Sequence, residues 1–136
     1  MEPVTLSVNL ILVLFVMFCH WFSDFVCQTD YQATNKSTKI TALLEHGACY
    51  GLLLFGSLGV LMCIPFLPFT TVVPTIGALV KFSLINMVLH TMIDFFTSKV
   101  SSMYYKQQRF HEFFVTVGFD QFLHTVCLLS TMYLYF

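Results

Sequence analysis

Imidazole and carboxylate side chains are the residues of this sequence with the clearest chemical potential. Seven of them lie in strongly apolar stretches, and six of these form pairs spaced four residues apart. Residues four apart share one face of a helix, so each pair would present two polar groups to the same neighbour. Ionisable groups inside membrane helices are costly and usually functional. The pairs are His20 with Asp24, His90 with Asp94 and Asp120 with His124, and the seventh residue is His46.

This ligand set indicates a divalent transition metal. Imidazole nitrogens combined with carboxylate oxygens suit Zn, Mn or non-haem Fe better than Ca or Mg. One tetrahedral zinc takes three or four ligands, so seven candidates imply either two metals or some residues in supporting roles. A bound metal would activate water as a nucleophile near neutral pH. The candidate catalytic residues are Asp24, Asp94, Asp120 and Lys99.

The composition excludes several classes of protein. Of 136 residues, 57% are hydrophobic and only 10% are charged, whereas a soluble domain carries about 25% charged residues. This excludes a soluble globular domain and a disordered tail. The net charge of -1 provides no basic face for nucleic acid. The five cysteines lie in apolar stretches without the spacing of a disulfide framework, so we expect free thiols.

Four apolar stretches are long enough to cross a bilayer as helices, which takes about 20 residues each. No long period-two alternation indicates barrel strands, and only helices satisfy their own backbone in lipid without closing a barrel. We therefore predict an all-α membrane protein, a four-helix transmembrane bundle that forms one domain over residues 1–136. Gly47 and Gly51 form a G-x-x-x-G pair that would let a partner helix approach closely. The expected helices cover residues 6–27, 43–67, 73–99 and 112–136, with a tight turn at Pro65, Pro68 and Pro74.

The two polar loops expected at residues 29–42 and 98–111 must share one side of the membrane. They carry five basic residues, so the positive-inside rule predicts that they are cytoplasmic and that both termini lie outside. With a rise of about 1.5 Å per residue, all the polar groups fall in the cytoplasmic half, where they would form one cavity. The basic residues are Lys36, Lys39, Lys99, Lys106 and Arg109.

The motif H-x3-D-F occurs at His20 and again at His90. Its repetition would fit two related helical hairpins, although the repeat is short and a duplication remains open.

The motifs resemble an uncharacterised family of small bacterial and phage integral membrane proteins, described as a domain of unknown function. That family shows H-x3-D-F-x2-Q, an Asn-Lys pair, a His that opens the second helix, H-x3-D-x4-K and D-Q-x2-H. The resemblance implies the fold and an integral membrane location, which we expect to be a bacterial inner membrane, but little about activity. A looser similarity is to membrane-bound metal-dependent hydrolases. The matching residues are His20, Asp24, Phe25, Gln28, Asn35, Lys36, His46, His90, Asp94, Lys99, Asp120, Gln121 and His124.

The leading functional hypothesis is a metal-dependent hydrolase of a lipid-linked or phosphate-bearing substrate. A small transporter or proton relay is an alternative, although the outer halves of the helices are almost purely apolar. A non-catalytic accessory protein with a structural polar network is another. Aspartates one turn from each histidine argue against haem. The expected partners are the lipid bilayer and the substrate, with a homo-oligomer left open. Candidate substrate-binding residues are Gln28, Asn35, Lys36 and Gln121.

Overall fold

The computed structural model describes residues 10–64 and 75–136, and all its regular secondary structure is helical. This confirms the predicted all-α class. The expected proline turn falls within residues 65–74 and so lies outside the described residues. In chain order the elements are α1 (Leu10–Trp21), a π-helical turn η1 (Phe22–Val26), α2 (Asp30–Asn35), α3 (Ile40–Met62), α4 (Ile76–Lys106) and α5 (Phe110–Tyr135).

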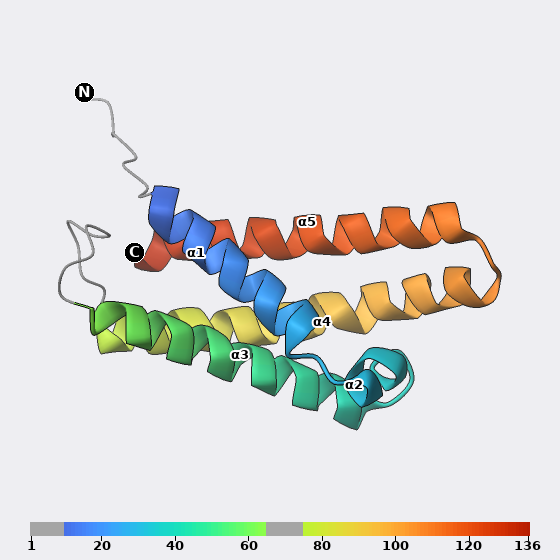
Figure 1. The fold of residues 1–136 in the computed structure, drawn as a ribbon, viewed down its shortest axis with the longest axis horizontal. Helices are drawn as coiled ribbons and strands as arrows, with labels where there is room; N and C mark the ends of the chain where they lie inside the picture. Colours follow the sequence, from blue (N-terminus) through green and yellow to red (C-terminus); the bar gives the residue numbers. More distant parts are fainter. Residues whose placement is uncertain (1–9, 65–74) are drawn as a thin grey trace.

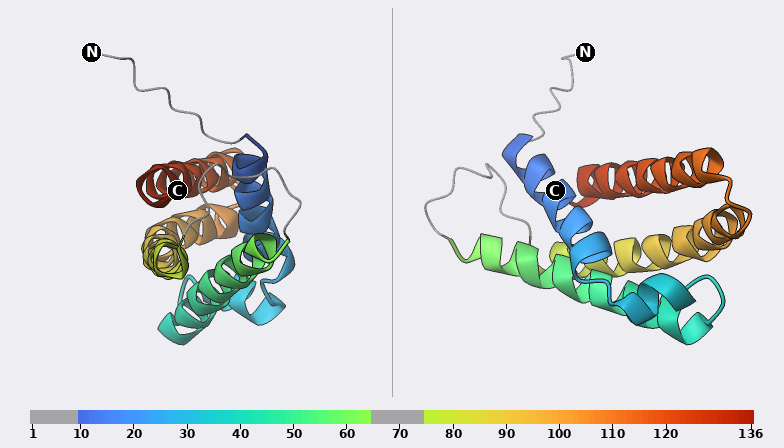
Figure 2. Two further views of the ribbon diagram at one scale, coloured as in Figure 1. Left: turned by 90° about the vertical axis from the view of Figure 1, so that its left-hand side faces the viewer. Right: turned by 45° about the vertical axis from the view of Figure 1, so that its right-hand side comes forward.

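The four longer helices pack around a common interior. α1 contacts α3 and α5, α3 also contacts α4, and α4 packs along α5. Figure 1 shows α3, α4 and α5 along the long axis, with α1 crossing them obliquely, and Figure 2 gives two further views. α2 and the turn between α4 and α5 lie at one end, whereas the start of α1 and the C-terminus lie at the other. The two polar connections therefore share one end of the bundle.

Both polar connections are more helical than the sequence suggested. The loop predicted at 29–42 contains α2, which begins with a capping box in which Thr29 and Gln32 exchange side-chain-to-backbone hydrogen bonds. The loop predicted at 98–111 is wrong for residues 98–106, which continue α4 to Lys106. This segment contains neither glycine nor proline, so its polarity alone does not end the helix. The chain turns at Gln108, whose φ is 56°.

The outer surface of the bundle is apolar. Large side chains such as Leu52, Phe96 and Phe114 have 71%, 63% and 67% of their surface exposed. Soluble proteins rarely expose apolar patches on this scale, whereas lipid tails cover them at no cost. Helices α3, α4 and α5 are long and apolar enough to cross a membrane, and the apolar segment Leu10–Val26 is shorter. The chain therefore has the character of an integral membrane protein.

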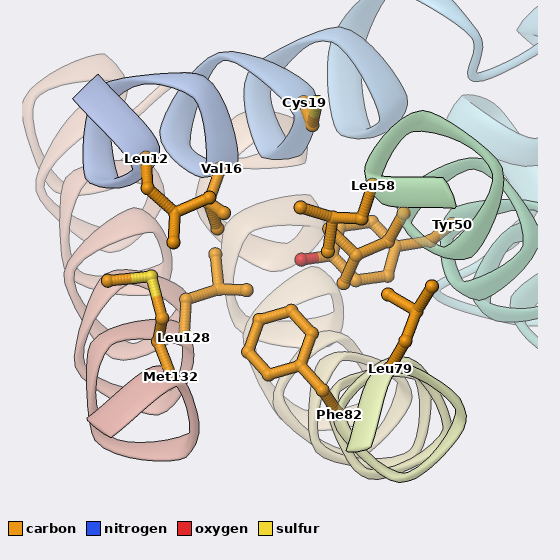
Figure 3. Packing of buried hydrophobic residues seen from close by; sticks show 10 residues of the cluster. Leu12, Val16, Cys19, Tyr50, Leu58, Leu79, Phe82, Leu128 and Met132 are labelled. Atoms are coloured by element: carbon orange, nitrogen blue, oxygen red, sulfur yellow. The ribbon is translucent and has the colours of Figure 1, made fainter. Parts of the chain in front are cut away.

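The interior is divided into an apolar half and a polar half. The apolar half lies toward the start of α1 and the end of α5, where side chains of all four long helices interdigitate (Figure 3). Farther toward the other end of the bundle, the buried side chains on the same helix faces follow at about four-residue spacing and are polar. The apolar cluster consists of Leu12, Val16, Cys19, Tyr50, Leu54, Leu58, Leu79, Phe82, Leu128 and Met132.

Two glycines bring α3 close to α4, as the sequence predicted. A Cβ atom at Gly47 would collide with the side chain of Thr91, and one at Gly51 would lie 2.8 Å from Cβ of Met87. Only a residue without a side chain allows this separation. Gly47 follows His46 directly, so the close approach also fixes His46 against α4. All five cysteines are free, as expected.

Candidate metal centre

The seven histidine and aspartate side chains singled out by their spacing converge in the polar half of the interior. Six of them are buried, and Asp120 is half-buried. Each long helix contributes, because the inward faces of α1, α3, α4 and α5 all become polar at the same depth. The sequence-based prediction of one shared buried cluster is confirmed by this arrangement.

A π-helical turn aims the end of the first helix at the cluster. In η1 the backbone N–H of Cys27 donates to the carbonyl of Phe22 at 2.9 Å, five residues back instead of four. The wider turn buries both Ser23 and Asp24, whereas Phe25 stays exposed. Such π turns occur frequently at functional sites. The carboxylate of Asp24 thereby reaches the centre of the bundle.

Four side-chain atoms meet at the heart of the cluster. Nε2 of His46 lies 3.0 Å from Oδ1 of Asp24, 3.0 Å from Nε2 of His90 and 3.3 Å from Oδ2 of Asp94. Nε2 of His90 lies 3.6 Å from each of the same two carboxylate oxygens. Two nitrogens and two oxygens from three helix segments, α3, α4 and η1, therefore surround one point.

Hydrogen bonds alone do not account for this packing. A ring nitrogen carries at most one hydrogen, so Nε2 of His46 cannot donate a straight bond to all three of its neighbours. Zinc–ligand distances of about 2.0–2.1 Å place tetrahedral ligands about 3.3 Å apart. The separations of 3.0 to 3.6 Å among these atoms bracket that value. The group formed by Asp24, His46, His90 and Asp94 could therefore hold a metal ion.

A second group surrounds His124. Its Nε2 is buried and has no hydrogen-bond partner within the described part of the chain. The same atom lies 3.5 Å from Oδ1 of Asp94 and 3.5 Å from Oδ1 of Asp120. The hydroxyl of Thr97 donates to that oxygen of Asp120 at 2.5 Å. Asp24 lies close enough to Asp120 and His124 to complete a second potential metal-binding group.

Gln121 and Tyr50 hold the remaining histidine beside these groups. The Gln121 amide donates to Oδ2 of Asp24 at 2.9 Å and to Oδ2 of Asp120 at 3.0 Å. Its oxygen accepts from Nε2 of His20 at 3.0 Å, and Nδ1 of His20 lies 3.2 Å from the Tyr50 hydroxyl. Both ring nitrogens of His20 are thus occupied. The predicted ligand His20 therefore lies next to the two groups and not within them.

A cavity of about 200 Å³ adjoins the cluster. It lies between η1, the segment after α2, and the polar ends of α4 and α5. Lys36, which follows α2 directly, lines this cavity and places Nζ 2.8 Å from Oδ2 of Asp94. Gln28 lines the same cavity, and its buried amide nitrogen has no partner among the described residues. A charged, partly water-accessible space therefore connects the cluster to the end with the polar connections.

Two predicted site residues do not reach the cluster. The Lys99 side chain is exposed, and its ammonium lies 3.4 Å from the centre of the Phe95 ring. Lys99 lies five positions after Asp94, which is about 140° around the helix axis, so the two cannot share a face. The Asn35 amide donates to the carbonyl of Tyr31 at 2.9 Å and so stabilises the end of α2.

Sequence reasoning missed two members of the site. Tyr50 stacks on His90 with 3.9 Å between ring centres and 4° between planes, which fixes the imidazole. Tyr50 follows His46 by four residues, so the helical spacing did contain the signal. Thr97, which binds Asp120, follows Asp94 by three residues and also shares its helix face.

Comparison of the chain with known proteins identifies one matching family, whose function is unknown. No curated protein and no solved structure matches the chain. One family model, described as "Protein of unknown function (DUF3307)", matches residues 11–136, which is nearly the whole chain. The chain therefore belongs to this family of unknown function, in keeping with the resemblance drawn from its motifs.

Proposed function

We propose that the chain crosses the membrane four times and consists of two related hairpins, α1 with α3 and α4 with α5. The segment Leu10–Val26 has 17 residues, a length of about 26 Å that lies at the short end of the range for membrane helices. Lys36, Lys106 and Arg109 lie at the end with the polar connections, so the positive-inside rule assigns that end to the cytoplasm. A bacterial inner membrane suits this topology.

The site would bind a divalent transition metal through Asp24, His46, His90 and Asp94. The carrying observation is the spacing of 3.0 to 3.6 Å in five atom pairs among their inward nitrogens and oxygens. Charge supports the same conclusion, because among the described residues three carboxylates meet one ammonium group, that of Lys36, in a largely buried region. One divalent cation neutralises the excess of two negative charges, which would otherwise be very costly in a low-dielectric interior. Two nitrogen and two oxygen ligands favour Zn, Mn or Fe.

Hydrolysis of a phosphate-bearing, lipid-linked substrate is the activity that this site would serve best. If the ion took up a water molecule as a fifth ligand beside its four protein ligands, it would lower the pKa of that water and so supply a nucleophile. The adjoining cavity of about 200 Å³ gives a substrate access from the headgroup region. Lys36 borders that cavity and can pair with a phosphate oxygen as well as with Asp94. Asp120 lies half-buried on the wall of that cavity, next to the position that a substrate would occupy.

The apolar half of the bundle favours an enzyme over a transporter. Transport requires a polar path to the opposite face. Between the cluster and the other end of the described bundle, mostly apolar side chains from all four long helices fill the interior, with Leu54, Phe82 and Leu128 among the most buried. The buried amide of Asn86 in this region is paired with the Thr131 hydroxyl. Within residues 10–64 and 75–136 the site opens toward one side only, which suits the binding, conversion and release of a substrate.

The test begins with metal content. The full chain, purified in lipid nanodiscs, is stripped with chelator and titrated with Zn²⁺ or Mn²⁺, and bound metal is measured by mass spectrometry. We expect high-affinity binding that His46→Gln or His90→Gln reduces at least tenfold. Glu45→Gln is the matched control, because Glu45 precedes His46 but is exposed. If the intact chain binds no metal, the proposed function is wrong.

Activity is measured on the same preparations. Phosphate release is followed from lipid phosphomonoesters and lipid pyrophosphates in mixed micelles. Hydrolysis should disappear with chelator, return with metal and fall at least a hundredfold in Asp94→Asn. A metal-loaded protein without activity on either lipid class would contradict the hydrolase assignment while leaving the metal site intact.

A further inference from the structure

The proposed single-metal site leaves one buried ligand atom unused. Nε2 of His124 has no hydrogen-bond partner among the described residues, and only 2% of the side chain is exposed. Leaving a buried polar atom unpaired costs about 1–3 kcal/mol, so such atoms call for an explanation. This nitrogen lies 3.5 Å from one oxygen of Asp94 and 3.5 Å from one oxygen of Asp120. Both distances are longer than those of good hydrogen bonds. They match the separation expected between two ligands of one metal ion.

Asp94 joins this position to the first one. Its Oδ2 belongs to the group with His46 and His90, and its Oδ1 points to His124. A carboxylate whose two oxygens face two ligand sets is the usual bridge in a two-metal site, where the ions are about 3.5–4 Å apart. Asp24 belongs to both potential metal-binding groups and adds a second link between them.

The helix arrangement repeats around this bridge. The rings of His46 and His90 have centres 5.0 Å apart, and the rings of His20 and His124 have centres 5.2 Å apart. His20 and His90 occupy equivalent places in the repeated H-x3-D-F motif, and His46 and His124 lie on the second helix of each hairpin. The rings of His90 and His124, one from each pair, stack with centres 4.3 Å apart, so the four histidines form one group beside the Asp24 and Asp94 carboxylates.

We propose that a second divalent ion binds His124, Asp120 and Asp94, beside the first, so that Asp94 bridges a dinuclear centre. Asp24 can contribute its oxygen to either ion. Thr97 and Gln121 hold the Asp120 carboxylate in place for this role through bonds of 2.5 Å and 3.0 Å. The inference rests on the proposed first metal site and extends it.

The charges of the loaded centre indicate what it would bind. One divalent ion and Lys36 just balance the three carboxylates, so a second divalent ion leaves an excess of two positive charges. A phosphate dianion at the adjoining cavity would neutralise this excess. Inorganic phosphate, which carries the group shared by a lipid phosphate and a free phosphate ester, should therefore strengthen binding of the second ion and leave the first unaffected.

The experiment measures how many Mn²⁺ ions bind to each chain and whether two bound ions lie close enough to be exchange-coupled. Metal-free full chain in nanodiscs is titrated with Mn²⁺, free Mn²⁺ is quantified by electron paramagnetic resonance, and the bound species is examined at low temperature. We expect two ions per chain and an exchange-coupled spectrum once both positions fill. Adding inorganic phosphate at low millimolar concentration should tighten the second step about tenfold.

Variants assign the second position. His124→Gln should bind one Mn²⁺ with an uncoupled spectrum, whereas His111→Gln, an exposed histidine on the same helix, should still bind two. The coupled spectrum of the unmodified chain does not depend on whether His124→Gln folds. One ion per chain, or two without coupling, would overturn the dinuclear centre and leave the proposed function standing. No bound ion would overturn the proposed function itself, and an unchanged second step with phosphate would overturn the charge-matching argument.

Discussion

Replacing Lys36 by methionine should destabilise the metal-free protein and at the same time strengthen metal binding. Lys36 Nζ lies 2.8 Å from Oδ2 of Asp94, whose side chain is 2% exposed. Methionine keeps most of the side-chain length but removes the charge. The Asp94 carboxylate then stays buried without its cation, unless a metal ion takes that place.

The magnitude follows from the geometry of the pair. At 2.8 Å and an effective dielectric constant of about 20, the gross attraction is about 6 kcal/mol. Desolvation offsets part of it, and removal of one partner of a buried pair costs about 3–5 kcal/mol. Because Lys36 is 17% exposed, we expect the lower end, about 3 kcal/mol. With zinc bound we expect about 1 kcal/mol, so zinc affinity should rise about 30-fold, which corresponds to the difference of about 2 kcal/mol.

The assay measures the free energy of unfolding in mixed detergent micelles, with and without zinc, together with zinc affinity. Lys106→Met, which removes an exposed lysine at the end of α4, is the matched control and should change neither quantity by more than about 0.5 kcal/mol. In an Asp94→Asn background, Lys36→Met should lose most of its effect. An equal loss of stability in both backgrounds, or weaker zinc binding in Lys36→Met, would refute the reasoning.

Two further substitutions test the helix packing and the support of the site. Gly47→Leu should destabilise the fold by more than 2 kcal/mol, because its Cβ meets the side chain of Thr91; Gly56→Ala, with open space around it, should be neutral or stabilising by up to about 1 kcal/mol in the same unfolding assay. Tyr50→Phe should cost about 1 kcal/mol through the lost contact with His20 Nδ1, while metal stoichiometry measured by mass spectrometry stays the same. Equal stability of the two glycine variants, or loss of metal in Tyr50→Phe, would contradict these expectations.

Periodicity predicted the cluster because helical spacing is a local property. Residues four apart, such as His90 and Asp94, must share a face whatever the rest of the fold does. Their apolar surroundings predicted the membrane helices, and agreement in depth predicted that the faces would meet. The same arithmetic, applied to residues three and five positions from Asp94, identifies Thr97 as a partner and excludes Lys99.

A periodic sequence pattern does not show which side-chain atoms of the site face one another. The π-helical turn at Phe22–Val26 changes the direction of Asp24 without any glycine or proline to mark it. Lys36 reaches Asp94 because α2 folds against the start of α3, a long-range arrangement of a polar connection. The loop predicted for residues 98–111 was wrong over residues 98–106 because polar residues at a membrane surface remain good helix formers.

The most direct test of the metal centre is X-ray absorption spectroscopy of the full chain loaded with one equivalent of Zn²⁺. The account predicts a four-coordinate ion with two imidazole nitrogens and two carboxylate oxygens at about 2.0–2.1 Å. His90→Gln should remove one imidazole from the signal, whereas His111→Gln should leave the spectrum unchanged. A spectrum of hydrated zinc without imidazole scattering, identical in all three proteins, would contradict the account.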